Sequence, residues 1–168
     1  MERLWAPWRM EYIKTTVQDN SGDACVFCEM LADPDDRKHL ILHRFERCFL
    51  VMNLYPYTSG HLMVVPTRHT ADFSGLTIEE HAEFGRTLAL AQSILVECFS
   101  PHGFNIGMNL GRTAGAGIQD HLHYHIVPRW SGDANFMTAV GQTRVMSESL
   151  DDSWLRLKEA LKKRLDPS

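Results

Sequence analysis

The hydrophobic positions of the chain fall into five short stretches, some alternating with polar residues and some continuous. Alternation with a period of two is typical of a strand, because successive side chains leave a strand on opposite faces. Turn-forming residues separate the stretches, most densely between Asn53 and Gly60. The pattern therefore predicts strands at 40–43, 47–52, 61–65, 104–110 and 121–128.

Two other segments repeat with the period of a helix. Thr77 and Glu80 form a capping box that opens a long helix to about Phe99, and Pro101 and Gly103 end it. Its core-facing stripe is Phe84, Leu88, Ala91, Leu95 and Cys98. A second stripe predicts a helix within 146–168 and consists of Leu150, Trp154, Leu157, Leu161 and Leu165. Strands with few helices between them predict an α+β domain with an antiparallel sheet.

The last predicted strand carries a histidine at every second position, His121, His123 and His125. A strand would place these three imidazoles on one face, and Pro128 would end it because proline donates no hydrogen bond to the ladder. Imidazole is the side chain that titrates near neutral pH, so it serves as base, acid, nucleophile or metal ligand. A neutral imidazole can attack phosphorus and form a covalent intermediate. The row predicts a catalytic site, against the alternative of three unrelated surface histidines.

A glycine-rich loop, 111–119, comes directly before the histidines. Glycine lets the backbone approach a ligand, and the amides of such a loop can bind phosphate oxygens. The loop is not a P-loop, because the Lys-Ser/Thr ending is missing. Its position indicates a phosphate-binding role for the amides at 115–119.

Cys25 and Cys28 are separated by two residues. Such a pair can be a redox couple, half of a zinc site, or two core thiols. A zinc site needs two further ligands, and His69 and His121 are candidates.

Composition narrows the possible functions. The chain of 168 residues predicts one domain, and its net charge of −4 gives no global attraction to nucleic acid or to anionic membranes. Neither a spanning apolar run nor a signal peptide is apparent, and four cysteines make no dense disulfide framework. We expect a cytoplasmic protein that binds neither nucleic acid nor membrane.

The segment His-Leu-His-Tyr-His-Ile-Val, at 121–127, resembles the motif of the histidine triad (HIT) nucleotide hydrolases and transferases. The wider run 115–137 is similar to the bacterial branch of diadenosine-tetraphosphate phosphorylase- or hydrolase-like proteins, and the resemblance extends from Leu4 to about Val145. It implies a HIT-like domain with a five-stranded sheet at 25–145, and a homodimer. Trp5, Pro7 and Trp8 are large residues in an otherwise irregular segment, so we expect the extension at 1–24 to dock on the domain or on a dimer partner, against the alternative of a partly ordered tail.

The resemblance also implies residue roles. His123 would attack the α-phosphorus of a dinucleoside polyphosphate or a related adenylated substrate, and His125 would pass a proton to the leaving group. His61 and His121 would orient the rings. The nucleotide would contact Asn53, Asn109, Gly115, Ala116, Gly117, Ile118 and Gln119. A structural zinc would be held by Cys25, Cys28, His69 and His121, and the chemistry would need no cofactor.

Alternatives remain at several points. Asn53 can instead be a turn cap, and His61 a hydrogen-bonded core histidine. Many HIT enzymes carry Ser or Thr in the loop where this chain has Ala116 and Gly117, so backbone amides, with Gln119, would replace the hydroxyl. The protein as a whole can be a nucleotide-binding sensor or scaffold with negligible turnover. A DNA-end adenylate repair enzyme is disfavoured by the mild acidity and by the lack of a basic extension.

Overall fold

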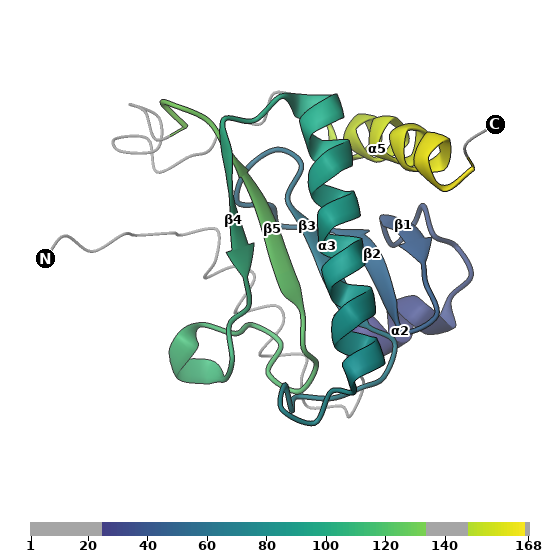
Figure 1. Ribbon diagram of the computed structural model, residues 1–168, viewed down its shortest axis with the longest axis vertical. Coiled ribbons are helices and arrows are strands. Elements are labelled where there is room, and N and C mark those ends of the chain that lie inside the picture. The colour runs from purple at the N-terminus through teal and green to yellow at the C-terminus, as the bar shows by residue number, and fades with distance from the viewer. Residues whose placement is uncertain (1–24, 134–147, 167–168) are drawn as a thin grey trace, which may run out of the picture.

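A single antiparallel sheet organises the protein (Figure 1). The computed structural model describes residues 25–133 and 148–166, so the predicted extension at 1–24 lies outside the described residues. The strands follow the order β1-β2-β3-β5-β4. Their bounds are Ile41–Arg44 for β1, Cys48–Met52 for β2, Leu62–Pro66 for β3, Gly103–Gly107 for β4 and Tyr124–Arg129 for β5. All five predicted strands and the α+β class are therefore confirmed.

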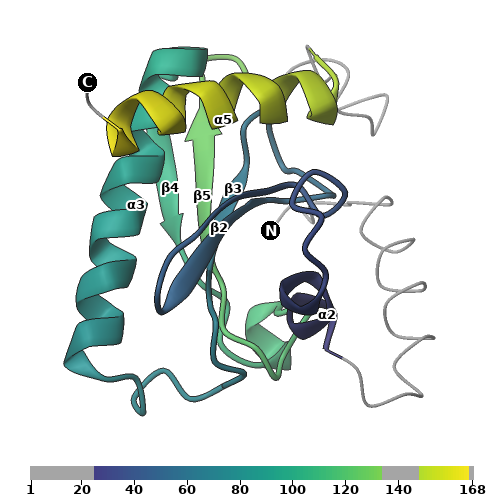
Figure 2. The same cartoon turned by 90° about the vertical axis from the view of Figure 1, so that its right-hand side faces the viewer.

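Helices cover both faces of the sheet (Figure 2). The long helix α3, Ile78–Phe99, crosses one face, with the C-terminal helix α5, Leu150–Leu165, packed against it and against β1. A short helix, α2, Val26–Ala32, lies on the other face. Strands β2 and β3, which each have a neighbour on both sides, are buried along their whole length because both faces of the sheet are covered.

Alternate residues of the strands enter two separate cores. Leu50, Val64 and Ile126 belong to the larger core, together with residues of α3 and α5. Phe49 and Met63 belong to a smaller core with Phe27 of α2. We call the side of the sheet that carries the smaller core the α2 face, and the opposite side the α3 face.

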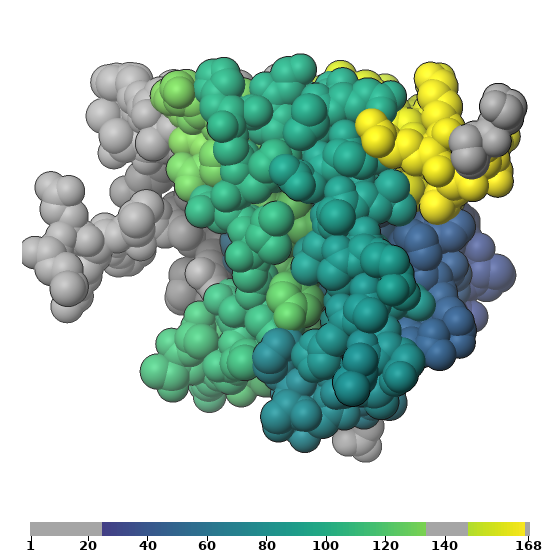
Figure 3. All heavy atoms as spheres, in the orientation of Figure 1, coloured from purple at the N-terminus to yellow at the C-terminus, as the bar shows by residue number. Residues whose placement is uncertain are grey.

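The capping box of α3 is present as predicted. Thr77 Oγ1 accepts from the Glu80 amide at 3.2 Å, and Glu80 Oε2 accepts from the Thr77 amide at 2.7 Å. Arg68 bonds the same carboxylate, and this hydrogen bond holds the pKa of Glu80 below its usual range. The side chains of α3 cover the middle of the α3 face (Figure 3).

Strand β5 differs from the prediction at both ends, and β4 ends at Gly107 where the prediction ended it at Leu110. Strand β5 starts at Tyr124, so His121 and His123 precede it, and it continues through Pro128 to Arg129. Pro128 is tolerated because β3 pairs with β5 only as far as Leu62 opposite Ile126. Beyond that pair no residue of β3 lies opposite Pro128, so the N–H that proline lacks has no ladder bond to make on that side. The Pro128 carbonyl there accepts from Thr58 Oγ1 at 2.8 Å.

The sequence pattern did not predict α2, whose C-terminus is held by an arginine from β1. Arg44 donates to the carbonyls of Met30, Leu31 and Asp33, and to Asp36 Oδ1. Carbonyls at a helix C-terminus have no partner within the helix, so a side chain that satisfies three of them stabilises the end.

We expect Arg44→Ala to lower the free energy of unfolding by about 1–3 kcal/mol, because it leaves half-buried carbonyls without donors. Urea unfolding would measure the loss. Arg37→Ala is the matched control, because Arg37 forms an exposed ion pair with Asp151 and its loss should cost much less. Equal losses in the two variants would contradict the capping role of Arg44.

No helix within 25–133 or 148–166 is both long enough and apolar enough to cross a membrane.

Candidate active site

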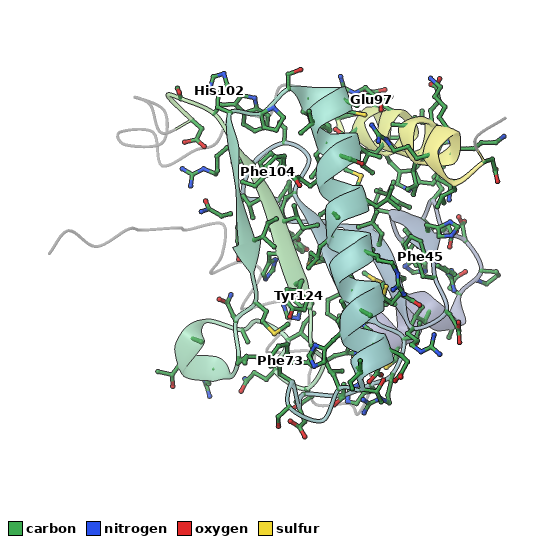
Figure 4. The ribbon with its side chains drawn as sticks, in the orientation of Figure 1. Phe45, Phe73, Glu97, His102, Phe104 and Tyr124 are labelled. Atoms are coloured by element: carbon green, nitrogen blue, oxygen red, sulfur yellow. The ribbon has the colours of Figure 1, made fainter. Side chains whose placement is uncertain are left out.

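The three triad histidines lie on the α2 face, although only His125 is in the strand. His125 pairs with Met63 of β3. The rings of His123 and His125 are 5.0 Å apart, and Phe27 of α2 packs against both His121 and His123. Tyr124, between two of the histidines, turns to the α3 face, where its ring contacts Phe84 (Figure 4). The alternation predicted from the sequence is thus present at 123–125.

Hydrogen bonding fixes the tautomer of His123. Its Nδ1 lies 2.9 Å from the carbonyl oxygen of His121, which can only accept, so Nδ1 carries the proton. The other nitrogen, Nε2, then keeps a lone pair. Burial lowers the pKa of His123, and the ring therefore stays neutral at neutral pH. A buried, neutral imidazole with a free lone pair is suited to attack phosphorus.

His125 is the opposite tautomer from His123, because of a chain of hydrogen bonds that begins at Tyr57. The Tyr57 amide donates to His61 Nδ1 at 3.1 Å, so the His61 proton is on Nε2. His61 Nε2 donates to His125 Nδ1 at 3.0 Å. The proton of a neutral His125 is therefore on Nε2. The site sets a lone pair on His123 beside an N–H on His125.

Asn53 and His61 are joined to each other. Asn53 Nδ2 lies 3.4 Å from His61 Nδ1, and its Oδ1 accepts from the Tyr55 amide at 2.9 Å. The side-chain oxygen of Asn53 thus caps a turn in the loop after β2, which agrees with the alternative interpretation of this residue. Contact with a nucleotide stays a prediction for this residue.

The glycine-rich loop contains a short 3-10 turn, Arg112–Ala114. Gly111 and Gly115 have φ of 78° and 91°, a region that favours glycine. The amides of Gly115 and Ala116 donate to the carbonyls of Arg112 and Gly111. They are engaged within the loop, which leaves the amides at 117–119 as the better candidates for phosphate.

The remaining predicted nucleotide contacts lie at the edges of the site. Asn109 lies two residues beyond the end of β4, where Gly107 pairs with His125. The side chain of Ile118 packs against the smaller core. Gln119 is exposed and lies two residues before His121.

The four predicted metal ligands converge at one point. Cys25 Sγ lies 3.3 Å from His121 Nδ1, and Cys28 Sγ lies 3.4 Å from His69 Nδ1 and 3.7 Å from His121 Nδ1. All four ligand atoms lie within 4.8 Å of one another. Bond lengths of about 2.3 Å to sulfur and 2.0–2.1 Å to nitrogen predict an edge of about 3.6 Å for a zinc tetrahedron. The distances and the donor set therefore fit zinc.

The tautomer of His121 supports the same conclusion. Its Nε2 donates to the Pro66 carbonyl at 2.8 Å, so the lone pair is on Nδ1, the atom that points at the two cysteines. The cluster also contacts His123 directly, because the His121 carbonyl accepts the His123 proton. A four-ligand zinc would have no open position and would be structural.

Sequence reasoning missed Phe27, which lies between the two cysteines and is 1% exposed. Its position in a Cys-x-x-Cys segment marks it as part of a compact unit. Nothing in the sequence says that its ring meets the histidines almost a hundred residues later.

Comparison with known proteins agrees with this geometry. A family model described as HIT domain matches residues 36–132. The chain belongs to the HIT domain family. Among its HIT relatives, a Mycobacterium tuberculosis protein named AP-4-A phosphorylase is 40% identical over 158 residues, which cover 91% of this chain and 80% of that protein.

Two further HIT relatives bear on substrate and metal. The bis(5'-adenosyl)-triphosphatase of Saccharomyces cerevisiae is 30% identical over 91 residues, covering 54% of this chain and 44% of that protein. The solved structure of a zinc-bound histidine triad family protein from Mycobacterium smegmatis has a TM-score of 0.69 and 26% identity. It covers 86% of this chain and 98% of its own. Two HIT relatives of this chain are thus named as enzymes of dinucleoside polyphosphates.

Proposed function

We propose that this HIT protein cleaves dinucleoside polyphosphates, of which diadenosine tetraphosphate is the model substrate, through a nucleotidyl-histidine intermediate. The observation that carries the proposal is the pairing of a lone pair on His123 Nε2 with a proton on His125 Nε2, 5.0 Å apart between ring centres. A nucleophile beside an acid is the arrangement that a displacement at phosphorus requires.

The reaction has two steps. In the first, His123 Nε2 attacks the α-phosphorus, a P–N bond forms and the bond to the bridging oxygen breaks. His125 Nε2 gives its proton to that oxygen, so nucleoside triphosphate departs. The negative charge left on the hydrogen-bonded pair of His125 and His61 is balanced by the positive charge that the new P–N bond places on the His123 ring. In the second, inorganic phosphate or water attacks the same phosphorus, His125 takes the proton, and the P–N bond breaks. Backbone amides at 117–119 and the Asn109 side chain would stabilise charge on the phosphoryl oxygens.

The metal has no part in these steps. We propose that Cys25, Cys28, His69 and His121 hold a structural zinc, on the grounds of their spacing and of the zinc-bound relative. The ion would fix His121 and, through it, the carbonyl that orients His123. All four cysteines are free, and zinc thiolates persist in a reducing cytoplasm, which is the compartment we propose.

We also propose that the protein is a homodimer. Strand β4 is an edge strand, and Asn105, Ile106 and Gly107 on it are exposed. An edge strand presents backbone groups that another strand can pair.

Product analysis tests the proposal. With diadenosine tetraphosphate and inorganic phosphate, attack at the α-phosphorus should give ADP and ATP. Without phosphate, it should give AMP and ATP, with one oxygen from labelled water in the AMP. ADP as the sole product in water would show symmetric cleavage and contradict attack at the α-phosphorus. Binding of the substrate without turnover would support a sensor instead.

A further inference from the structure

Four aromatic rings follow one another across the site: Tyr57, His125, His123 and Phe27. The ring centres of Tyr57 and His125 are 5.8 Å apart, those of His125 and His123 are 5.0 Å apart, and those of His123 and Phe27 are 5.3 Å apart. The two histidines of the proposed mechanism are therefore enclosed between two side chains that carry no chemistry in it.

Phe27 is the buried end of this row. Its ring meets the His121 ring at 5.4 Å and the Phe49 ring at 6.2 Å, both edge-on, and it is 1% exposed. It belongs to α2, whose end is held by Arg44. Phe27 is thus fixed from several sides, and its ring forms a rigid wall against His123.

Tyr57 is the partly open end. Its ring lies 4.6 Å from the His61 ring as well as 5.8 Å from the His125 ring, and its amide donates to His61 Nδ1. The next residue, Thr58, bonds the Pro128 carbonyl of β5, which holds this loop against the strand that carries His125. Tyr57 therefore contacts both members of the hydrogen-bonded histidine pair.

A hydrogen bond at one ring nitrogen does not by itself immobilise an imidazole, because the ring can still tilt about that bond. Steric contact with a neighbouring ring removes this freedom. Displacement of a reacting group by about 1 Å can cost about 100-fold in rate. Walls on both outer sides would hold the His123 lone pair and the His125 proton in line.

We propose that Phe27 and Tyr57 are positioning residues for catalysis, Phe27 for the nucleophile His123 and Tyr57 for the acid His125. The inference rests on the proposed function. The two residues would affect different parts of the reaction. Loss of Phe27 impairs formation of the P–N bond, and loss of Tyr57 impairs protonation of the leaving group.

Two substrates separate these roles. Diadenosine tetraphosphate has a leaving group that gains from protonation, whereas the 4-nitrophenyl ester of AMP releases a stable phenolate and needs little acid catalysis. We expect Phe27→Leu to lower kcat about 10- to 100-fold on both substrates. We expect Tyr57→Leu to lower kcat about tenfold on the dinucleotide, because a misplaced acid loses part of the ~10²–10⁴-fold that acid catalysis typically contributes. On the ester the same variant should lower kcat less than about twofold.

Matched controls remove a ring of the same kind nearby. Phe49→Leu opens the same core as Phe27→Leu, and Tyr55→Leu alters an exposed tyrosine of the same loop. Both variants should keep kcat within about threefold of the wild type. Phe49→Leu should nevertheless lower the thermal stability by about as much as Phe27→Leu does. Phe27→Tyr and Tyr57→Phe, which keep a ring, should restore most of the lost rate.

Imidazole ¹H–¹⁵N spectra give a readout without turnover. His123 should show a single form protonated at Nδ1 in the wild type and in Phe49→Leu, and a mixture of tautomers in Phe27→Leu. Equal kcat in each variant and its control, with unchanged spectra, would overturn the positioning role. A wild type that cleaves neither substrate would instead refute the proposed function.

Discussion

Replacement of His123 by alanine should reduce turnover of diadenosine tetraphosphate by at least about a thousandfold, because removing a covalent nucleophile abolishes the pathway that it opens. The loss should appear in kcat with little change in KM. The ring is 7% exposed and offers one nitrogen to the substrate side, so its contribution to ground-state binding is small.

The covalent adduct distinguishes a lost nucleophile from a distorted site. With a substrate labelled at the α-phosphorus, the wild type should yield labelled protein after a denaturing quench, and His123→Ala should yield none. His125→Ala should still accumulate adduct from the 4-nitrophenyl ester, because that leaving group needs little help from an acid.

A control histidine comes from the opposite side of the sheet. His81 is exposed on α3, where its ring contacts Phe73. His81→Ala should retain wild-type turnover and labelling. Labelled protein from His123→Ala at wild-type yield would reassign the nucleophile to another residue.

The sequence predicted the sheet well because its signals are local. Hydrophobic stretches of four to eight residues, some alternating and some continuous, marked the strands, and the Thr77–Glu80 capping box marked the start of α3 to within one residue. The conversion of these elements into one order, β1-β2-β3-β5-β4, depends on pairings between distant residues that no local pattern encodes.

The three histidines show the limit of prediction from a local sequence pattern. The period of two correctly separated Tyr124 from His123 and His125, but His121 leaves the strand geometry. The Leu122 amide bonds the Thr70 carbonyl, and His121 Nε2 bonds the Pro66 carbonyl. One contact with the last residue of β3 and one with the segment after it therefore override the alternation and turn His121 toward the cysteines.

Helix α2 escaped prediction for a related reason. Seven residues are too few to display a helical period, and the segment Val26–Ala32 has no side-chain cap at its N-terminus. It is held by tertiary contacts, from Arg44 at one end and from Phe27 in the smaller core. The metal cluster was predictable because ligand chemistry limits the candidates, whereas the contact of Phe27 with His123 depends on packing alone.

Metal analysis of the purified protein should find about one zinc per chain, and removing it should lower the melting temperature markedly. An ion that binds the folded state alone stabilises it by mass action, and structural zinc contributes about 10–16 kcal/mol in peptides that fold only with metal. This domain has a separate larger core, so we expect a fraction of that value, several kcal/mol, lost on treatment with a strong chelator.

Substitutions of single cysteines test whether the proposed zinc ligands account for the loss of stability on chelation. Cys28→Ser should abolish stoichiometric zinc and shift the melting temperature as far as chelation does, and chelator should then have no further effect. Cys98→Ser is the matched control, because Cys98 is a half-buried thiol whose Sγ faces the Arg156 carbonyl, away from the cluster. It should keep both the zinc and the response to chelator.

The zinc also makes a specific prediction for the active site. Because His121 donates from Nε2 to Pro66, points Nδ1 at the cysteines and accepts the His123 proton at its carbonyl, loss of the ion should free the segment that orients His123. Nucleotidyl labelling of His123 should therefore fall on chelation at a temperature where the protein stays folded by circular dichroism, and zinc should restore it. A metal-free protein with full stability and full labelling would show that the four side chains hold the fold without an ion, and that His123 is oriented by Phe27 and the His121 carbonyl alone.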